Sequence, residues 1–252
     1  MSRKRYLVQG AVVDEALIAD LRQLLRADVE RIHQPDESEI SQTAARRLEA
    51  VAEHSPAFIC LLAEPWLGAD ITDRTGGLLR DCARIHLYAR ILDDAVDEQG
   101  PLYRHNLLRA QPLFWEAVQN IGAAVPATVA GEAAHLIAET VSAVQIDDRE
   151  RNPLYWGAKN HHLLLIPLLL SGNSPAYQDC RRELSALIAL VQAGDEWRQG
   201  EMNQNRLRSE FIEFLVDCLN TEKLAVLSRN GWPAATERIV WNARQLFDVL
   251  CG

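Results

Sequence analysis

A cluster of carboxylates follows an apolar run in the middle of the chain. Asp93, Asp94 and Asp97 come directly after the segment IHLYARIL, which has the apolar spacing of a helix. Asp93 and Asp97 stand four residues apart on one helical face, where their charges repel unless a cation lies between them. Mg²⁺ suits such a pair, because it takes oxygen ligands and is commonly held by one or two carboxylates plus substrate phosphates. A solvated acidic helix end is the alternative interpretation.

A second acidic group ends another apolar run about a hundred residues later. In VQAGDEWRQ, Asp195 and Glu196 are adjacent carboxylates, and Gln199 follows Asp195 by about one helical turn. Two helices of this design could face each other across one cavity and hold two or three Mg²⁺ ions, with Mn²⁺ as the other candidate. Such ions would bridge to a diphosphate, which a chain of net charge −9 does not attract by itself.

The first acidic motif resembles the DDxxD motif of the class I isoprenoid synthase fold. That superfamily contains the trans-prenyl diphosphate synthases, the squalene and phytoene synthases, and the class I terpene cyclases. DDAVDE matches the motif in full, and its approach IHLYARILDD is similar to the IHxxxLxxDD helix of the family. The resemblance implies that His86 and Tyr88 lie in the substrate pocket. Arg90 matches the arginine of the YAxxRxxDDxxDE pattern, where it would contact the diphosphate or pair with Asp94.

The second acidic motif is similar to the family pattern FQxxDDxxD. It matches at Gln192 and Asp195, is conservative at Glu196, and departs from the pattern at Gln199, where the family has aspartate. The resemblance places Gln192 in the substrate pocket. It implies metal binding by Asp93, Asp94, Asp97, Asp195, Glu196 and Gln199.

Basic residues upstream and between the motifs resemble diphosphate-binding positions of the family. Lys159 precedes the apolar run LLLIPLLL, as a diphosphate-binding lysine does in the family. Arg46 and Arg47 occupy the place of the GGKRxRP motif that binds isopentenyl diphosphate. Arg47 matches and Arg46 is conservative, but Glu49 replaces the second arginine and the proline is missing. A solvated face of an amphipathic helix is the alternative for the arginine pair.

The resemblance implies Mg²⁺-assisted ionisation of an allylic prenyl diphosphate, with Asp93 and Asp97 as catalytic residues. The degraded isopentenyl-binding segment favours a terpene synthase or cyclase, which releases diphosphate as a lyase. A prenyltransferase is the alternative, through chain elongation or through a condensation like that of squalene and phytoene synthases. A non-catalytic subunit that binds prenyl diphosphate is a further alternative. The family is also compatible with a homodimer.

The elements that must position these residues are predicted to be helices. Apolar residues recur at spacings of three and four, and no run of alternating β-branched residues competes with this pattern. No linker or repeat divides the chain, so we expect residues 1–252 to form one all-α, single-domain helical bundle around a deep central cavity, of the isoprenoid synthase type. Pro167 should kink its helix or lie in its first turn. The predicted helices cover residues 16–32, 44–52, 75–92, 107–121, 129–144, 161–170, 183–197, 210–219 and 236–250.

Composition excludes several other classes of protein. With 26 Lys and Arg against 35 Asp and Glu, we expect no nucleic-acid partner. The longest apolar run, residues 163–170, is far shorter than the roughly 20 residues that span a bilayer, so we expect no stable membrane insertion. The five scattered cysteines suggest neither a disulfide framework nor a zinc site, and a cytoplasmic location fits them best. His161 and His162 would lie about 100° apart on a helix, which favours packing over a shared metal.

Overall fold

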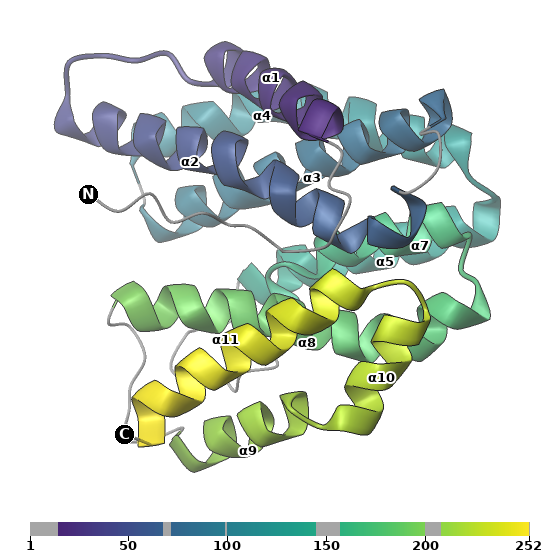
Figure 1. Cartoon of the computed structure of the whole chain (residues 1–252). Coiled ribbons are helices and arrows are strands. Elements are labelled where there is room, and N and C mark those ends of the chain that lie inside the picture. Colours follow the sequence, from purple (N-terminus) through teal and green to yellow (C-terminus); the bar gives the residue numbers. More distant parts are fainter. Residues whose placement is uncertain (1–14, 68–71, 99, 145–156, 200–207, 252) are drawn as a thin grey trace.

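The computed structural model describes residues 15–67, 72–98, 100–144, 157–199 and 208–251, and these residues form helices and no strand (Figure 1). The prediction of an all-α chain is confirmed for this part of the sequence. The α-helices are α1 (Glu15–Ile32), α2 (Glu39–Leu62), α3 (Asp73–Asp97), α4 (Pro101–Ala124), α5 (Ala127–Val144), α7 (Leu165–Ser171), α8 (Pro175–Gln199), α9 (Arg208–Cys218), α10 (Thr221–Arg229) and α11 (Pro233–Cys251). The 3₁₀ helices are η1 (Glu64–Trp66) and η3 (His161–Leu164).

Seven of the nine predicted segments lie within a single α-helix, and these helices are longer than the apolar periodicity that revealed them. The 161–170 segment is divided between η3 and α7, and the 210–219 segment extends one residue beyond α9. The 16–32 segment is α1 almost to the residue, whereas 44–52 is only the middle of α2. Helix α10 was missed, because nine residues are too few for a clear apolar period. Its start is nevertheless marked in the sequence by Asn220, whose side chain accepts hydrogen bonds from the backbone N–H groups of Glu222 and Lys223.

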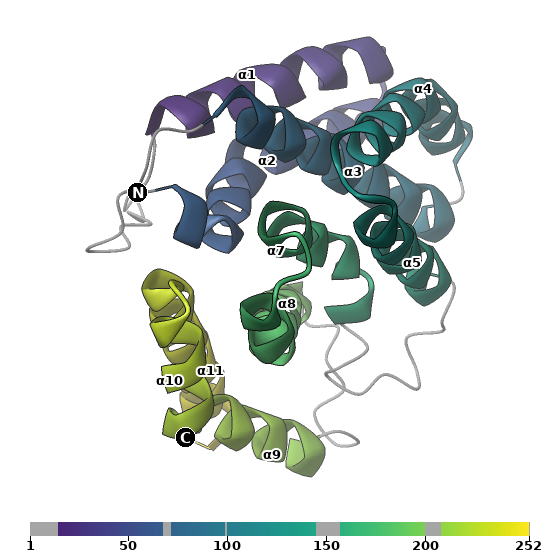
Figure 2. The same cartoon turned by 90° about the vertical axis from the view of Figure 1, so that its right-hand side faces the viewer.

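Helix α7 lies at the centre of the fold. Residues 165–169 are all buried, as expected for a short helix that is apolar on every side. It packs against α2, α3, α5 and α8, and Figure 2 shows it between the α1–α4 group and α8. Pro167 is the third residue of α7, which places it in the first turn, where its missing N–H has no helical partner to lose. Gly172 ends α7 with φ of +63°.

Helix α3 carries the first acidic motif into the middle of the molecule. The side chain of Thr72 caps its start by accepting a hydrogen bond from Thr75 N–H. The helix contacts α1, α2, α4, α5, α7 and η3, and its buried residues lie on several sides rather than on one stripe. Its last turn contains Asp93, Asp94 and Asp97. The sequence therefore places carboxylates at the end of a long helix that packs against several others.

Helix α8 carries the second acidic motif and faces the centre from the other side. It packs against α7 and η3 through one face and against α10 and α11 through another. In Figures 1 and 2, α9 lies at the opposite end of the fold from α1, whereas α11 also contacts α2. One continuous cluster of buried apolar side chains includes residues from α1 through to α11.

Two further features considered in the sequence, the cysteines and the length of the apolar helices, can be examined in the structure. All five cysteines are free thiols, and four of them are buried. Among the described residues, no helix has the length and apolar character needed to cross a membrane.

Candidate functional site

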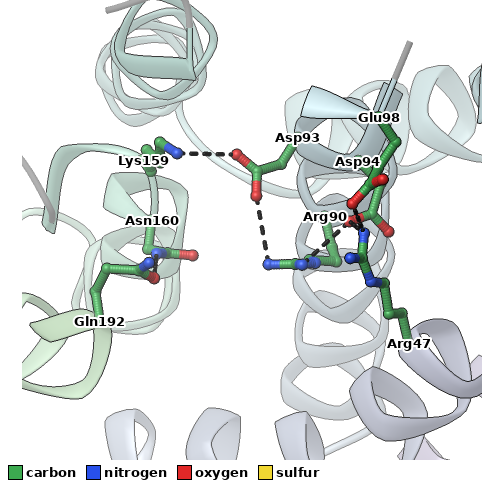
Figure 3. A network of polar contacts seen from close by, with 8 residues as sticks. All are labelled: Arg47, Arg90, Asp93, Asp94, Glu98, Lys159, Asn160 and Gln192. Carbon is green, nitrogen blue, oxygen red and sulfur yellow. Dashed lines mark hydrogen bonds and ion pairs between the residues drawn. The ribbon is translucent and has the colours of Figure 1, made fainter. Parts of the chain in front are cut away.

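The Asp93 carboxylate is enclosed by two cations from different parts of the chain. Its Oδ2 lies 3.3 Å from Nη1 of Arg90, one turn earlier on α3, and its Oδ1 lies 3.3 Å from Nζ of Lys159 (Figure 3). The Lys159 side chain is only 9% exposed. Within the described residues, Oδ1 is buried and accepts no hydrogen bond, because the ammonium lies at ion-pair distance without hydrogen-bond geometry. Asp93 therefore has an oxygen that a further ligand could use.

The neighbouring Asp94 has a separate set of partners. Its Oδ1 lies 3.1 Å from Nη2 of Arg90 and 3.3 Å from Nη1 of Arg47, which belongs to α2. The same Arg47 nitrogen lies 2.5 Å from Oε1 of Glu98. Burial raises the pKa of the Asp94 carboxyl, and the charges of Arg90 and Arg47 oppose that rise.

Cations and carboxylates balance in this cluster. The carboxylates belong to Asp93, Asp94 and Glu98, and the cations to Arg47, Arg90 and Lys159. An arrangement of this kind offsets the repulsion that adjacent aspartates would otherwise have at the end of a buried helix. It also means that any metal ion must compete with the chain's own cations for the aspartate oxygens.

A small polar cavity lies beside Asp93. Its volume is about 30 Å³, which is room for about one water molecule. The residues that line it are His86, Ala89, Arg90, Asp93, Val144, Lys159, Asn160 and Gln192. Ligand pockets usually enclose roughly 300–1,000 Å³. The deep central cavity predicted from the sequence is therefore not confirmed, and the space beside Asp93 in the described residues is polar and small.

Five of the predicted site residues meet at this cavity. Helix α3 supplies His86, Arg90 and Asp93, α8 supplies Gln192, and the turn before η3 supplies Lys159. The amide of Asn160 donates to Oε1 of Gln192 at 3.0 Å, which connects the Lys159 turn to α8. Figure 3 shows Lys159, Asn160 and Gln192 facing Asp93 from one side.

Other predicted residues lie elsewhere. Arg46 is exposed and donates to the Gln42 carbonyl and the Thr43 hydroxyl of its own helix. Tyr88 stacks on Phe114 of α4, with ring centroids 4.1 Å apart, and does not line the cavity. The reason is the helical period: Tyr88 is two residues from His86 and points about 200° around α3.

Asp97 and Asp195 do not line the cavity. Asp97 is exposed at the end of α3, and Asp195 is half-buried on α8, one turn after Gln192. Residues 196 and 199 lie within α8, but the Glu196 and Gln199 side chains are outside the described part of the structure. Among the described residues, no group of three or more His, Cys, Asp or Glu side chains is close enough to form a metal site.

The types of donor atom beside the cavity are those that Mg²⁺ prefers. Asp93 offers a buried carboxylate oxygen that accepts no hydrogen bond in the described structure, and the Gln192 amide supplies a neutral oxygen beside the same cavity. Mg²⁺ takes oxygen ligands of this type and keeps several of its waters, so it needs no complete protein cage. Zinc favours histidine and cysteine ligands, whereas the donors beside this cavity are mainly oxygen atoms.

Two histidines form a buried pair that reaches the cavity wall. Nδ1 of His86 lies 3.0 Å from Nε2 of His162, and Nε2 of His86 lies 2.8 Å from the Ser55 hydroxyl. The His86 and His162 rings stack with centroids 5.3 Å apart. His161 points elsewhere, with Nδ1 3.4 Å from Glu139. The two adjacent histidines thus have different partners, as the expectation of packing over a shared metal requires.

This histidine pair predicts an acid-sensitive fold. Burial, and secondarily the Arg90 charge, lowers the pKa of His86 to about 4, and burial also lowers the pKa of His162. Below the unfolded value near pH 6.5, the unfolded chain binds more protons than the folded one, so the free energy of unfolding falls as the pH falls toward 4. We expect His86 alone to contribute up to about 3 kcal/mol to this loss.

The test is urea unfolding of the unchanged protein and of His86→Gln between pH 7.5 and 4.5. The variant should lose less stability across this range, because Gln does not take up a proton. A matched variant, His105→Gln, alters an exposed histidine of α4 and should keep the pH dependence of the unchanged protein. Equal pH dependence in all three proteins would contradict the assignment to His86.

Some residues of the site were not predicted from the sequence. Glu98 and Asn160 each follow a predicted residue closely, but no residue pattern distinguished them from surface polar groups. Ser55 lies on α2, far in sequence from its partner His86. Such long-range pairs leave no local signal, so only the fold could reveal them.

Comparison with known proteins provides no functional information for this chain. No protein-family model, no curated protein and no solved structure significantly matches it.

Proposed function

We propose that this chain is a Mg²⁺-dependent enzyme of isoprenoid biosynthesis that ionises an allylic prenyl diphosphate and releases diphosphate, in the manner of a class I terpene synthase. The observation that carries the proposal is the meeting of residues that were matched to separate motifs of the family. Arg47, Arg90 and Lys159, each matched in sequence to a diphosphate-binding position, all contact Asp93 or Asp94 of the intact DDxxD motif. Charge pairing alone would account for cations beside buried carboxylates, and the proposal adds that these cations stand at the positions matched to diphosphate binding.

The chain's own residues have distinct tasks in this mechanism. Bound Mg²⁺ would be held by Asp93, Asp97 and Asp195, and it would take up negative charge as the carbon–oxygen bond of the substrate breaks. Arg90 and Lys159 adjoin the cavity, so their N–H groups can donate to the departing diphosphate oxygens. Their charges are already fixed in place by ion pairs, which lowers the reorganisation needed during reaction. No protein nucleophile is required. The breaking carbon–oxygen bond leaves its electron pair on diphosphate, and the allylic cation, cyclised or not, becomes a neutral product by losing a proton that the released diphosphate can accept.

The position of Arg46 favours diphosphate release over elongation with isopentenyl diphosphate. In chain-elongating relatives of this fold, the corresponding segment binds the second substrate. Here Arg46 is exposed, donates hydrogen bonds to its own helix and does not line the cavity. A prenyltransferase of the squalene and phytoene synthase type does not need that segment, so it stays an alternative that the choice of substrates tests.

A non-catalytic subunit that binds prenyl diphosphate is a second candidate. The ion pairs that neutralise Asp93 and Asp94 favour it, because they stabilise the cluster without a metal ion. The cavity of about 30 Å³ also requires side chains to move apart before a prenyl chain can enter. This candidate predicts binding of diphosphate without turnover, which the experiments below separate from catalysis.

We expect Mg²⁺ and inorganic diphosphate to stabilise the protein together and only weakly when added singly. Mg²⁺ alone must compete with Arg90 and Lys159 for Asp93, and diphosphate alone meets the aspartate charges. At about 100-fold excess over the dissociation constant, binding adds about 2.7 kcal/mol, which shifts Tm by roughly 5–10 °C for a chain of this size. Thermal unfolding with each addition, and with Mg²⁺ plus sulfate as control, measures the effect. A plain helical scaffold predicts no shift specific to diphosphate.

Turnover is tested by incubation with geranyl, farnesyl and geranylgeranyl diphosphates, with and without isopentenyl diphosphate. A terpene synthase releases diphosphate and an unphosphorylated product without isopentenyl diphosphate, whereas an elongating enzyme requires it. Activity should need Mg²⁺ or Mn²⁺. Undiminished activity in excess EDTA would rule out the proposed mechanism, and binding without diphosphate release would favour the non-catalytic candidate.

A further inference from the structure

Adjacent residues of the DDxxD motif face different surroundings. Asp93 lines the cavity with Lys159 and Gln192. Asp94 is 4% exposed and lies on another side of α3, in a packed region with Tyr103 and Asn106. Successive residues of an α-helix point about 100° apart, which accounts for the separation. Figure 3 shows the Asp93 side chain reaching toward Lys159 and the Asp94 side chain lying on the Arg47 side.

The partners of Asp94 are guanidinium groups from two helices. Its Oδ1 lies within ion-pair distance of both Arg47 and Arg90. Glu98 also pairs with Arg47, but Asp94 is the carboxylate that contacts both cations and offsets their mutual repulsion. Each side chain nevertheless remains partly accessible, at 36% for Arg47 and 38% for Arg90. A guanidinium carries five N–H donors, so each arginine keeps donors for a further anion.

We propose that Asp94 is a positioning residue and not a metal ligand. It holds Arg47 of α2 beside Arg90 of α3, so that both guanidinium groups stand at the edge of the site and can bind the diphosphate group. This inference rests on the proposed function and changes one part of the sequence-based assignment, which gave Asp94 to the metal ions. In the structure, Asp93 lines the cavity, whereas Asp94 contacts the two arginines.

A metal ligand and a positioning residue affect different measured quantities, so the inference can be tested. Loss of a metal ligand raises the Mg²⁺ concentration required for diphosphate binding. Loss of a residue that positions arginines weakens diphosphate binding at saturating Mg²⁺, because one or both guanidinium groups move away. The variant Asp94→Asn keeps the shape of the side chain and removes its charge, and Asp94→Glu keeps the charge.

Titration calorimetry with inorganic diphosphate over a series of Mg²⁺ concentrations tests the inference. For Asp94→Asn we expect diphosphate affinity about tenfold lower, the loss of about one charge-assisted hydrogen bond, and a Mg²⁺ half-saturation within about twofold of the unchanged protein. Asp93→Asn, the matched variant, should raise the Mg²⁺ half-saturation instead. Asp94→Glu should recover part of the affinity. A rise in Mg²⁺ half-saturation for Asp94→Asn equal to that of Asp93→Asn would overturn the inference.

A double-mutant cycle between Asp94→Asn and Arg47→Gln guards against a general loss of folding. If Asp94 acts through Arg47, the double variant should bind diphosphate about as well as the weaker single variant. Additive losses would overturn the inference while leaving the proposed function intact. Absence of Mg²⁺-dependent diphosphate binding in the unchanged protein would overturn the proposed function and, with it, this assignment.

Discussion

Replacement of Asp93 by asparagine is expected to lower the rate of diphosphate release at least about 100-fold and to leave the helical fold intact. The side chain keeps its shape but loses the charge that faces the cavity, and removal of one group that stabilises a transition-state charge typically costs about 10²–10³ in rate. Arg90 keeps its second partner, Asp94, at 3.1 Å. Lys159 loses an ion-pair partner, so the free energy of unfolding should fall by no more than a few kcal/mol.

Release of diphosphate from an allylic substrate and the far-ultraviolet circular dichroism spectrum measure the two parts of this expectation. Asp20→Asn is a matched control, because Asp20 also pairs with an arginine of α3, Arg80, at 3.2 Å, but its side chain is 58% exposed and remote from the cavity. We expect Asp97→Asn to abolish turnover as well. Diphosphate release at the unchanged rate in the Asp93 variant would remove the basis for the catalytic assignment.

Local sequence patterns predicted the helices well because each helix buries an apolar face. The segment before Asp93 is helical, and its acidic end coincides with the end of α3. The acidic residues at 195 and 196 likewise lie near the end of α8. Apolar spacing alone predicted both of these helices. Helix α10 lacked a long enough period, and its start depended on one capping residue, Asn220.

The partners within the site could be anticipated only in part. Lys159 and Gln192 were selected by resemblance, and the structure brings both to the cavity with Asp93. Resemblance could not decide whether Arg90 pairs with Asp94 or stands free for a ligand, because that depends on rotamers and on Arg47 from another helix. The structure pairs Arg90 with both aspartates.

Cavity size and the direction of Tyr88 depend on packing that no single segment specifies. Tyr88 belongs to the same helix as Asp93, yet its ring is taken up by Phe114 of α4. The apolar side chains of α7 are buried at the centre of the described fold, and the deep cavity predicted from the sequence is not confirmed there. An apolar run in the sequence predicts burial equally well whether the helix lines a cavity or fills the space.

Lys159→Met is expected to weaken binding of inorganic diphosphate roughly 10- to 100-fold at saturating Mg²⁺. Lys159 is the cation of the site that lies on the α8 side of the cavity, and its Nζ is 3.3 Å from Asp93. Methionine keeps most of the length of the side chain and its apolar contacts but has no charge. A hydrogen bond to a charged group is worth about 1.5–3 kcal/mol, which corresponds to the expected loss. Titration calorimetry with inorganic diphosphate measures it.

Two controls make this result specific to the charge of Lys159. Lys159→Arg keeps the charge and should retain most of the affinity, and Lys223→Met removes a lysine of α10 that pairs with Asp217 away from the cavity. If Lys159 served only to neutralise Asp93, its removal would leave diphosphate affinity unchanged and would lower the Mg²⁺ half-saturation, because the metal ion would no longer compete with the ammonium. A role in diphosphate binding predicts lower diphosphate affinity whatever happens to the Mg²⁺ requirement. The direction of the change in diphosphate affinity therefore decides between a lysine that binds substrate and a lysine that only balances charge.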